Sequence, residues 1–223
     1  MNLPRRLTTE FIGTAFLLMT VIGSGIMAER LAQGNDAIAL LANSLATGCA
    51  LYALILIFGP VSGAHFNPAV TLGMALEKRI AKTDAAAYTV VQIMAAFAGV
   101  ALAHLMFGEP LFTASVKIRT GGGQWLSEFI ATFGLLSVIW GCVRHKIPAV
   151  PAAVACYITA AYWFTSSTSF ANPAVTLARG FSDSFAGIRP EDAAGFIMAQ
   201  LAGAIAATLV ARYWAVSPTG NQS

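Results

Sequence analysis

A six-residue sequence, Asn-Pro-Ala-Val-Thr-Leu, occurs twice in this chain, at residues 67–72 and 172–177. In each copy Asn stands where it can cap a helix, and Pro follows at the first helical position. Both residue types are preferred at those positions. A helix N-terminus carries roughly half a positive charge, and the Asn side chain adds NH donors. The two copies therefore offer hydrogen-bond donors in a positive field, which suits a neutral polar molecule and repels a cation.

The elements around the two copies have the composition of membrane spans. The chain of 223 residues is 57% hydrophobic and only 10% charged, and its mean hydropathy is +0.70. A soluble domain of this size does not need so much apolar surface. Because a span takes about 20 residues, the uncharged stretches predict six spanning helices and two shorter surplus segments. The predicted spans are 9–28, 37–58, 85–107, 124–143, 149–166 and 192–214, and the surplus segments are 60–77 and 168–182.

Three landmarks recur in the same order along the chain: a Glu-x-x-x-Thr helix start, the Asn-Pro-Ala sequence, and a Gln in a later span. They are Glu10 and Glu128, Asn67 and Asn172, and Gln92 and Gln200. We interpret residues 1–223 as a single domain, with a first repeat at about 5–108 and a second at about 120–215. Each repeat has three spans, an odd number, so the second repeat is inverted. The two surplus segments then enter from opposite faces and meet near the middle of the membrane.

The residues just before the two Asn-Pro-Ala sequences are predicted to be non-helical. Backbone of that kind persists at membrane depth only where it is buried in protein or lines a wet cavity. Paired, interrupted segments in two halves indicate a binding or conduction site at the midplane. The sequence therefore predicts a pore for uncharged solutes in a lipid bilayer. The backbone carbonyls expected to line it belong to Gly63, Ala64, His65, Ser169, Phe170 and Ala171.

At this point the chain resembles the aquaporin, or major intrinsic protein, superfamily over nearly its whole length. The resemblance is carried by residues 62–70, the second Asn-Pro-Ala, and the paired Glu and Gln residues. It implies an all-α membrane protein with six transmembrane helices, two re-entrant half-helices in two inverted repeats, one pore per subunit, and a homotetramer. It also implies a constriction formed by Asn67, Pro68, Ala69, Asn172, Pro173 and Ala174.

The resemblance further implies that Glu10 and Glu128 hydrogen-bond the half-helix loops from inside the bundle. This role agrees with the rule that carboxylates within a membrane need partners. The alternative is that both carboxylates lie at a helix end among the lipid headgroups.

A selectivity filter is the other site that the resemblance implies, at Thr47, Ala160, Ser169 and Val175. Water-selective members resemble one another in having an aromatic residue, a His, a small residue and an Arg there. This sequence departs at three of the four positions, and Val175 stands where the Arg is expected. Smaller side chains and the loss of a fixed charge predict a wider ring. Bacterial members associated with arsenic resistance look similar, because they share Asn-Pro-Ala-Val-Thr and a filter without Arg.

The expected solutes are water and arsenite, which is a neutral trihydroxide at neutral pH, with glycerol, urea and ammonia as further candidates. Thr176 stands where glycerol-conducting members carry Asp, so the chain resembles neither the orthodox water type nor the glycerol type. A channel mainly for water remains an alternative. Inverted repeats with broken helices also build secondary transporters, and a non-conducting tetramer is a third alternative. Coupled transporters place an ionisable group at the midplane, and the two central uncharged stretches contain only His65.

Other classes of function lack a sequence signal. No nucleophile–base pair, metal-ligand cluster or phosphate-binding loop is visible, so we expect no enzyme activity, no cofactor and no metal. The net charge of +3 comes from cations dispersed at the predicted span ends, which does not indicate a nucleic-acid partner.

The positions of the cations predict the orientation in the membrane. Eight Lys and Arg residues fall on the N-terminal side and five on the other, which favours cytoplasmic termini in the cell (inner) membrane under the positive-inside rule. The eight are Arg5, Arg6, Lys78, Arg79, Lys82, Arg144, Lys146 and Arg212, and the five are Arg30, Lys117, Arg119, Arg179 and Arg189.

Arg179 is a candidate for a displaced filter arginine. It lies seven residues after Asn172, so its Cα is about 10 Å farther along a helix. At that distance the sequence predicts an ion pair with Asp183 at i+4 instead. His65 is predicted to support the vestibule on the N-terminal side.

Overall fold

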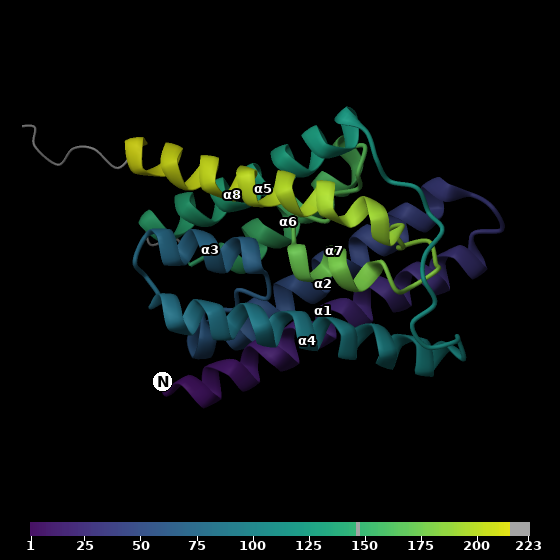
Figure 1. Cartoon of the computed structure of the whole chain (residues 1–223), viewed down its shortest axis with the longest axis horizontal. Coiled ribbons are helices and arrows are strands. Elements are labelled where there is room, and N and C mark those ends of the chain that lie inside the picture. The colour runs from purple at the N-terminus through teal and green to yellow at the C-terminus, as the bar shows by residue number, and fades with distance from the viewer. Residues whose placement is uncertain (146–147, 215–223) are drawn as a thin grey trace, which may run out of the picture.

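The computed structural model describes residues 1–145 and 148–214, and within these ranges all regular structure is helical (Figure 1). Four helices form the first repeat, and four, with a short 3-10 helix, form the second. The first four are α1 (Leu3–Leu31), α2 (Asp36–Ser62), α3 (Pro68–Leu76) and α4 (Lys82–Phe107). The others are α5 (Gly122–Arg144), α6 (Val150–Phe164), α7 (Pro173–Arg179), η1 (Pro190–Asp192) and α8 (Ala193–Trp214).

The two repeats pack in corresponding ways. α1 packs against α4 and α2 in the first repeat, as α5 packs against α8 and α6 in the second. The half-helices α3 and α7 each contact the last helix of their own repeat and the last helix of the other one, so α3 touches α8 and α7 touches α4. The predicted inverted repeat is therefore present as a set of matched helix contacts.

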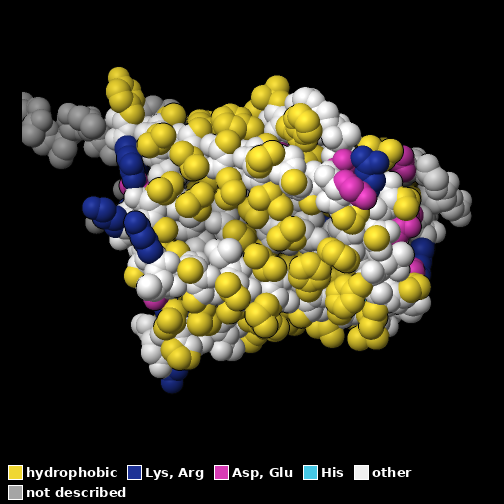
Figure 2. Space-filling view, in the orientation of Figure 1, with side chains coloured by type: hydrophobic (Ala, Val, Ile, Leu, Met, Phe, Trp, Pro, Cys, Tyr) yellow, Lys and Arg dark blue, Asp and Glu magenta, His cyan; other side chains and the backbone are white. Residues whose placement is uncertain are grey.

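The bundle has two ends. The N-terminus, the end of α8 and the turn 77–81 lie at one end, which we name the termini end (Figure 1). The connections 32–35, 108–121 and 180–189 lie at the other, which we name the loop end. Hydrophobic side chains cover the surface between the ends, and charged side chains gather at the ends (Figure 2). This distribution is that of a protein whose middle faces lipid.

Five helices are long and apolar enough to cross a membrane, namely α1, α2, α4, α5 and α8 with its preceding turn. The sixth predicted span corresponds to α6, which has 15 residues and is shorter than the roughly 20 residues of a full span. Several helices also extend beyond the predicted bounds. α1 begins at Leu3 because the Asn2 side chain accepts a hydrogen bond from the Arg5 amide, and Arg6 in its first turns pairs with Asp84 of α4 at 3.0 Å.

Glycines let the paired helices approach closely. A Cβ atom at Gly99 of α4 would overlap the Ala15 carbonyl of α1, and one at Gly203 of α8 would overlap the Phe129 carbonyl of α5. Small residues at helix interfaces permit this contact in membrane proteins. The crossing is the same in both repeats. Gly99 sets the distance between the helices that carry Glu10 and Gln92, and Gly203 sets the distance between those that carry Glu128 and Gln200.

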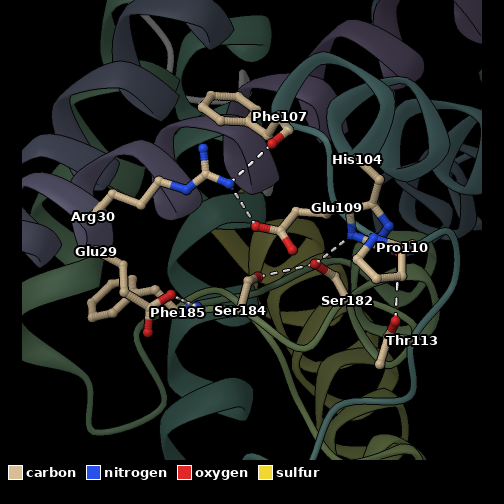
Figure 3. Close-up of polar contacts among 10 residues, drawn as sticks. All are labelled: Glu29, Arg30, His104, Phe107, Glu109, Pro110, Thr113, Ser182, Ser184 and Phe185. Carbon is tan, nitrogen blue, oxygen red and sulfur yellow. Dashed lines mark hydrogen bonds and ion pairs between the residues drawn. The ribbon is translucent and has the colours of Figure 1, made fainter.

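Polar contacts fasten the connections at the loop end (Figure 3). The Arg30 guanidinium of α1 donates to Glu109 Oε1 at 2.8 Å, and the His104 ring of α4 lies 2.9 Å from Ser182 Oγ. The backbone amide of Phe185 donates to the Glu29 carboxylate at 2.9 Å. The segment after α7 is thereby held against α1 and α4.

Candidate functional site

The N-termini of the two half-helices meet inside the bundle. The Asn67 Nδ2 donates to the Ala171 carbonyl at 2.7 Å, and the Asn172 Nδ2 donates to the Phe66 carbonyl at 2.8 Å. Each Asn Oδ1 accepts a hydrogen bond from an amide of its own helix, as at Ala69 N, 2.8 Å away. The amide orientation is therefore fixed, and each NH2 group keeps a second hydrogen. The Ala171 carbonyl, which we expected to accept a hydrogen bond from a solute, accepts one from Asn67 of the other repeat.

Glu10 of α1 anchors the first loop. Its carboxylate has no exposed surface. Oε1 accepts from Ser62 Oγ at 2.6 Å and from the His65 amide at 3.0 Å, and Oε2 accepts from the Phe66 amide at 2.7 Å and from Gln92 Nε2 at 2.9 Å. Four donors to one side chain are the partners that a buried carboxyl group requires.

Glu128 of α5 anchors the second loop in the same way. It is equally buried, and it accepts from Ser167 Oγ at 2.5 Å, the Phe170 amide at 2.9 Å, the Ala171 amide at 2.8 Å and Gln200 Nε2 at 2.6 Å. Both carboxylates therefore lie inside the bundle, and the alternative position in the headgroup layer does not match the structure.

Sequence reasoning missed the two serines in these networks. Ser62 and Ser167 each accept from the amide two residues later while donating to the glutamate. Each stands five residues before the Asn of its repeat. That equal spacing was a signal that could have identified them.

The loops hold strained backbone. In the second loop Thr168, Ser169 and Ala171 have φ values of 62°, 51° and 49°, and in the first loop Ala64 and Phe66 both have a φ of 48°. A non-glycine residue in this left-handed region costs on the order of 1–3 kcal/mol. The hydrogen bonds to the two glutamates offset that strain, since the backbone amides that donate to the glutamates belong to the same loop segments.

A cavity with about 870 Å³ of empty space, including its open mouths, runs along both loops. One wall carries the polar groups of the loops and both motif asparagines, and the remaining wall is apolar. Leu17, Leu51, Leu135 and Ile139 are typical of the apolar wall, which α1, α2, α5 and α6 supply. A solute in this space can exchange its hydration for hydrogen bonds on one side only, which suits a small neutral molecule.

The predicted filter residues do not all reach this cavity. Thr47, Ser169 and Val175 line it. Ala160 does not: its side chain is exposed on the outer face of α6, so its assignment to the filter is wrong. Tyr162, two residues later and therefore on the inner face of the helix, lines the cavity, and its hydroxyl lies 3.2 Å from Thr47 Oγ1.

Arg179 differs from its prediction as well. It is buried, it lines the cavity, and its Nε donates to the Ala186 carbonyl. The expected partner Asp183 instead accepts from the Val116 amide at 3.1 Å. The reason is that α7 ends at Arg179, so Asp183 is not on the same helix and the i+4 rule does not apply.

His65 lines the cavity on the side of the first loop. Its Nδ1 lies 3.1 Å from Thr71 Oγ1, and its ring packs at 5.2 Å between centroids against Tyr88. These contacts give it a supporting position. Among residues 1–145 and 148–214, no group of three or more His, Cys, Asp or Glu side chains is placed to hold a metal ion.

Comparison with known proteins places this geometry in a family. Residues 1–149 match the model of the major intrinsic protein family. The chain is 54% identical over 217 residues to aquaglyceroporin AqpS of Rhizobium meliloti (strain 1021), covering 97% of this chain and 92% of that protein. It is 30% identical over 209 residues to aquaporin AqpM of Methanothermobacter thermautotrophicus, covering 81% and 82%.

The fold is also that of a solved structure. The aquaglyceroporin from Plasmodium falciparum superposes with a TM-score of 0.74 over 96% of both chains, at 21% sequence identity. The family accounts for the paired half-helices, the buried glutamates and the lipid-facing surface. The protein is therefore a passive membrane channel for water and small solutes, not an enzyme, and it belongs to the major intrinsic protein family of aquaporins and aquaglyceroporins.

Proposed function

We propose that this channel conducts arsenite and small polyols as well as water, through a filter in which no arginine follows the second Asn-Pro-Ala. The observation that carries the proposal is Val175. It lines the cavity at the position directly after that motif, so an apolar side chain takes the place of a large cation that would narrow the pore.

The other lining groups support a hydroxylic solute. Thr47 and Tyr162 present hydroxyl groups 3.2 Å apart, and the Ser169 hydroxyl is buried with no protein partner among the described residues. The Tyr162 ring and Val175 add apolar surface. Alternating hydroxyl and apolar faces match a molecule that carries several hydroxyls on a small core, such as glycerol or arsenite. Urea and ammonia are smaller candidates for the same path.

A channel mainly for water is the second candidate, and Tyr162 favours it. The wide filter was predicted with Ala160 on the same helix. Tyr162 lines the cavity instead, and its aromatic ring reduces the space available to a polyol. The two candidates differ in solute flux relative to water flux, so one experiment distinguishes them.

The experiment compares liposomes containing wild type, Val175→Arg and Ala160→Phe. We expect wild type to take up arsenite and glycerol, and Val175→Arg to lose at least about tenfold of that uptake, which corresponds to about 1.4 kcal/mol in barrier height. Its water flux should stay within about twofold. Stopped-flow light scattering gives water and glycerol flux, and elemental analysis of washed liposomes gives arsenite.

Ala160→Phe is the matched control, because it adds bulk on the same helix but away from the cavity. Its solute and water fluxes should equal those of wild type. Rapid water flux with no arsenite or glycerol entry in wild type would reject the polyol channel in favour of the water channel.

Two further features belong to the same proposal. The protein is proposed to reside in the cell (inner) membrane with both termini cytoplasmic, because the exposed cations gather at the termini end (Figure 2). Lys146 lies outside the described residues. The homotetramer implied by the family resemblance is proposed too, and the mass of the detergent-solubilised protein tests it.

A further inference from the structure

Two buried guanidinium groups flank one aromatic ring at the loop end of the pore. Arg179, the last residue of α7, is 1% exposed, and Arg119, from the connection between α4 and α5, is 7% exposed. Their guanidinium carbons lie 3.3 and 5.1 Å from the centroid of the Phe170 ring. Phe170 and Arg179 line the cavity, so one charge stands at the conduction path and the other lies against a ring that lines it.

Neither guanidinium forms an ion pair with a carboxylate of the described residues, although the charge of Glu128 acts favourably on both from more than 4.0 Å away. Arg119 donates to the carbonyls of Gly187 at 2.8 Å and Ser167 at 3.1 Å, and Arg179 donates to the carbonyl of Ala186. Within the part of the chain that the structure describes, no Asp or Glu oxygen lies within 4.0 Å of either group. A buried charge without a direct ion-pair partner is destabilising, so stability alone does not explain two of them.

Arg179 also faces the path directly. It lines the cavity, and its two Nη nitrogens donate to no acceptor among the described residues. The side chain of a helical residue tilts toward the helix N-terminus, which carries this guanidinium back from the end of α7 to Phe170, two residues before Asn172. Val175, four residues earlier on α7, lies on the same helix face.

We propose that Arg179, backed by Arg119, forms a cation barrier at the loop end of this pore, in addition to the positive field of the two half-helix N-termini, and supplies the positive charge that is missing at Val175. The inference rests on the proposed function, in which Val175 leaves its own position uncharged. A guanidinium repels a cation in a low-dielectric passage and leaves a neutral solute unaffected. Both guanidinium groups keep their charge at neutral pH, since arginine is not deprotonated in proteins. Even with burial lowering the pKa of Arg119 to about 10, that group stays protonated.

Urea and the guanidinium ion make a matched pair of probes, because they are similar in size and shape and differ in charge. Wild-type liposomes should take up guanidinium at least about tenfold more slowly than urea. In Arg179→Gln, which keeps a donor for the Ala186 carbonyl, the guanidinium-to-urea ratio should rise at least about tenfold. Arg179→Lys keeps the charge and should retain the wild-type ratio.

Arg30→Gln is the control for a general loss of positive charge at the loop end, because Arg30 is exposed and paired with Glu109. It should leave the ratio unchanged. Equal entry of both probes in wild type overturns the proposal without any variant. An unchanged ratio in Arg179→Gln overturns it as well. Should that variant lose water flux, Arg179→Met, which keeps the apolar stem over Phe170, is tested in the same way.

The outcome for urea separates this inference from the proposed function. If urea does not enter liposomes with the wild-type protein, the wide filter is rejected. The cation barrier is then tested with protons, because protons can move along the water in any water-filled pore. A rise of at least about tenfold in proton flux relative to water flux in Arg179→Gln supports the barrier. No rise overturns it.

Discussion

At the scale of single residues, Glu10 and Glu128 make the rest of the site possible. Each is buried and accepts four hydrogen bonds, two of them from amides of a strained loop. Without these carboxyl oxygens the amides would be buried donors with no partner. The two carboxylates are therefore the reason that non-helical backbone persists at membrane depth.

Replacing Glu10 by Gln should destabilise the protein by about 2–4 kcal/mol, because one acceptor oxygen becomes an NH2 donor that faces other donors. Glu128→Gln should have an equal effect, since its contacts are equivalent. Thermal unfolding in detergent measures the loss, and water flux in liposomes should fall with it. Glu109→Gln is the control, because its exposed ion pair with Arg30 contributes only about 0–1 kcal/mol. A wild-type melting temperature for Glu10→Gln would contradict this role.

Single residues also show where sequence reasoning stops. The asparagine caps were predictable, because Asn followed by Pro has a strong local preference at a helix start. Ala160 was misplaced because the family resemblance assigned it by its position along the chain, and the largely apolar α6 gave no periodicity that could correct the assignment to the face that carries Tyr162. Arg179 was misread because its partner depended on where α7 ends, and the prediction did not use the helix-stop signal that Gly180 gives.

At the scale of elements, the crossing of α1 with α4, and of α5 with α8, positions the anchoring glutamates. Gly99 makes that contact in the first repeat and Gly203 in the second. The half-helices were predicted from the two surplus segments, since an uncharged stretch too long for one span has to be interrupted. The starts of the long helices were not, because capping by Asn2 and pairing of Arg6 with Asp84 extend α1 past its uncharged part.

Gly99→Ala should destabilise the bundle by about 1–3 kcal/mol, because its Cβ would overlap backbone that cannot move independently. Gly203→Ala should behave in the same way. Gly59→Ala is the matched control: a Cβ there meets nothing within 4 Å, and Ala in a helix is favourable by about 0.4–1 kcal/mol. Thermal unfolding of the three variants should therefore give two losses and one small gain. Equal melting temperatures would show that the crossing does not depend on glycine.

At the scale of the whole molecule, the cations serve two separate purposes. Exposed Lys and Arg side chains gather at the termini end, as at Arg5, Lys78 and Lys82. At the loop end two of the five cations are buried beside the pore, where they contact Phe170 instead of solvent. The positive charge exposed at the two ends is thus more unequal than the sequence count of eight Lys and Arg residues at one end and five at the other. This difference strengthens the argument for cytoplasmic termini.

Cysteine labelling tests that orientation. Lys78 lies in the turn at the termini end and Thr113 in the connection at the loop end, and both are exposed. In a chain whose exposed Cys49 and Cys156 have been replaced by Ser, Thr113→Cys should react with a membrane-impermeant maleimide in intact cells. Lys78→Cys should react only after the membrane is permeabilised. The reverse pattern would place the termini outside, and Arg179 would then guard the cytoplasmic mouth of the pore instead of the external one.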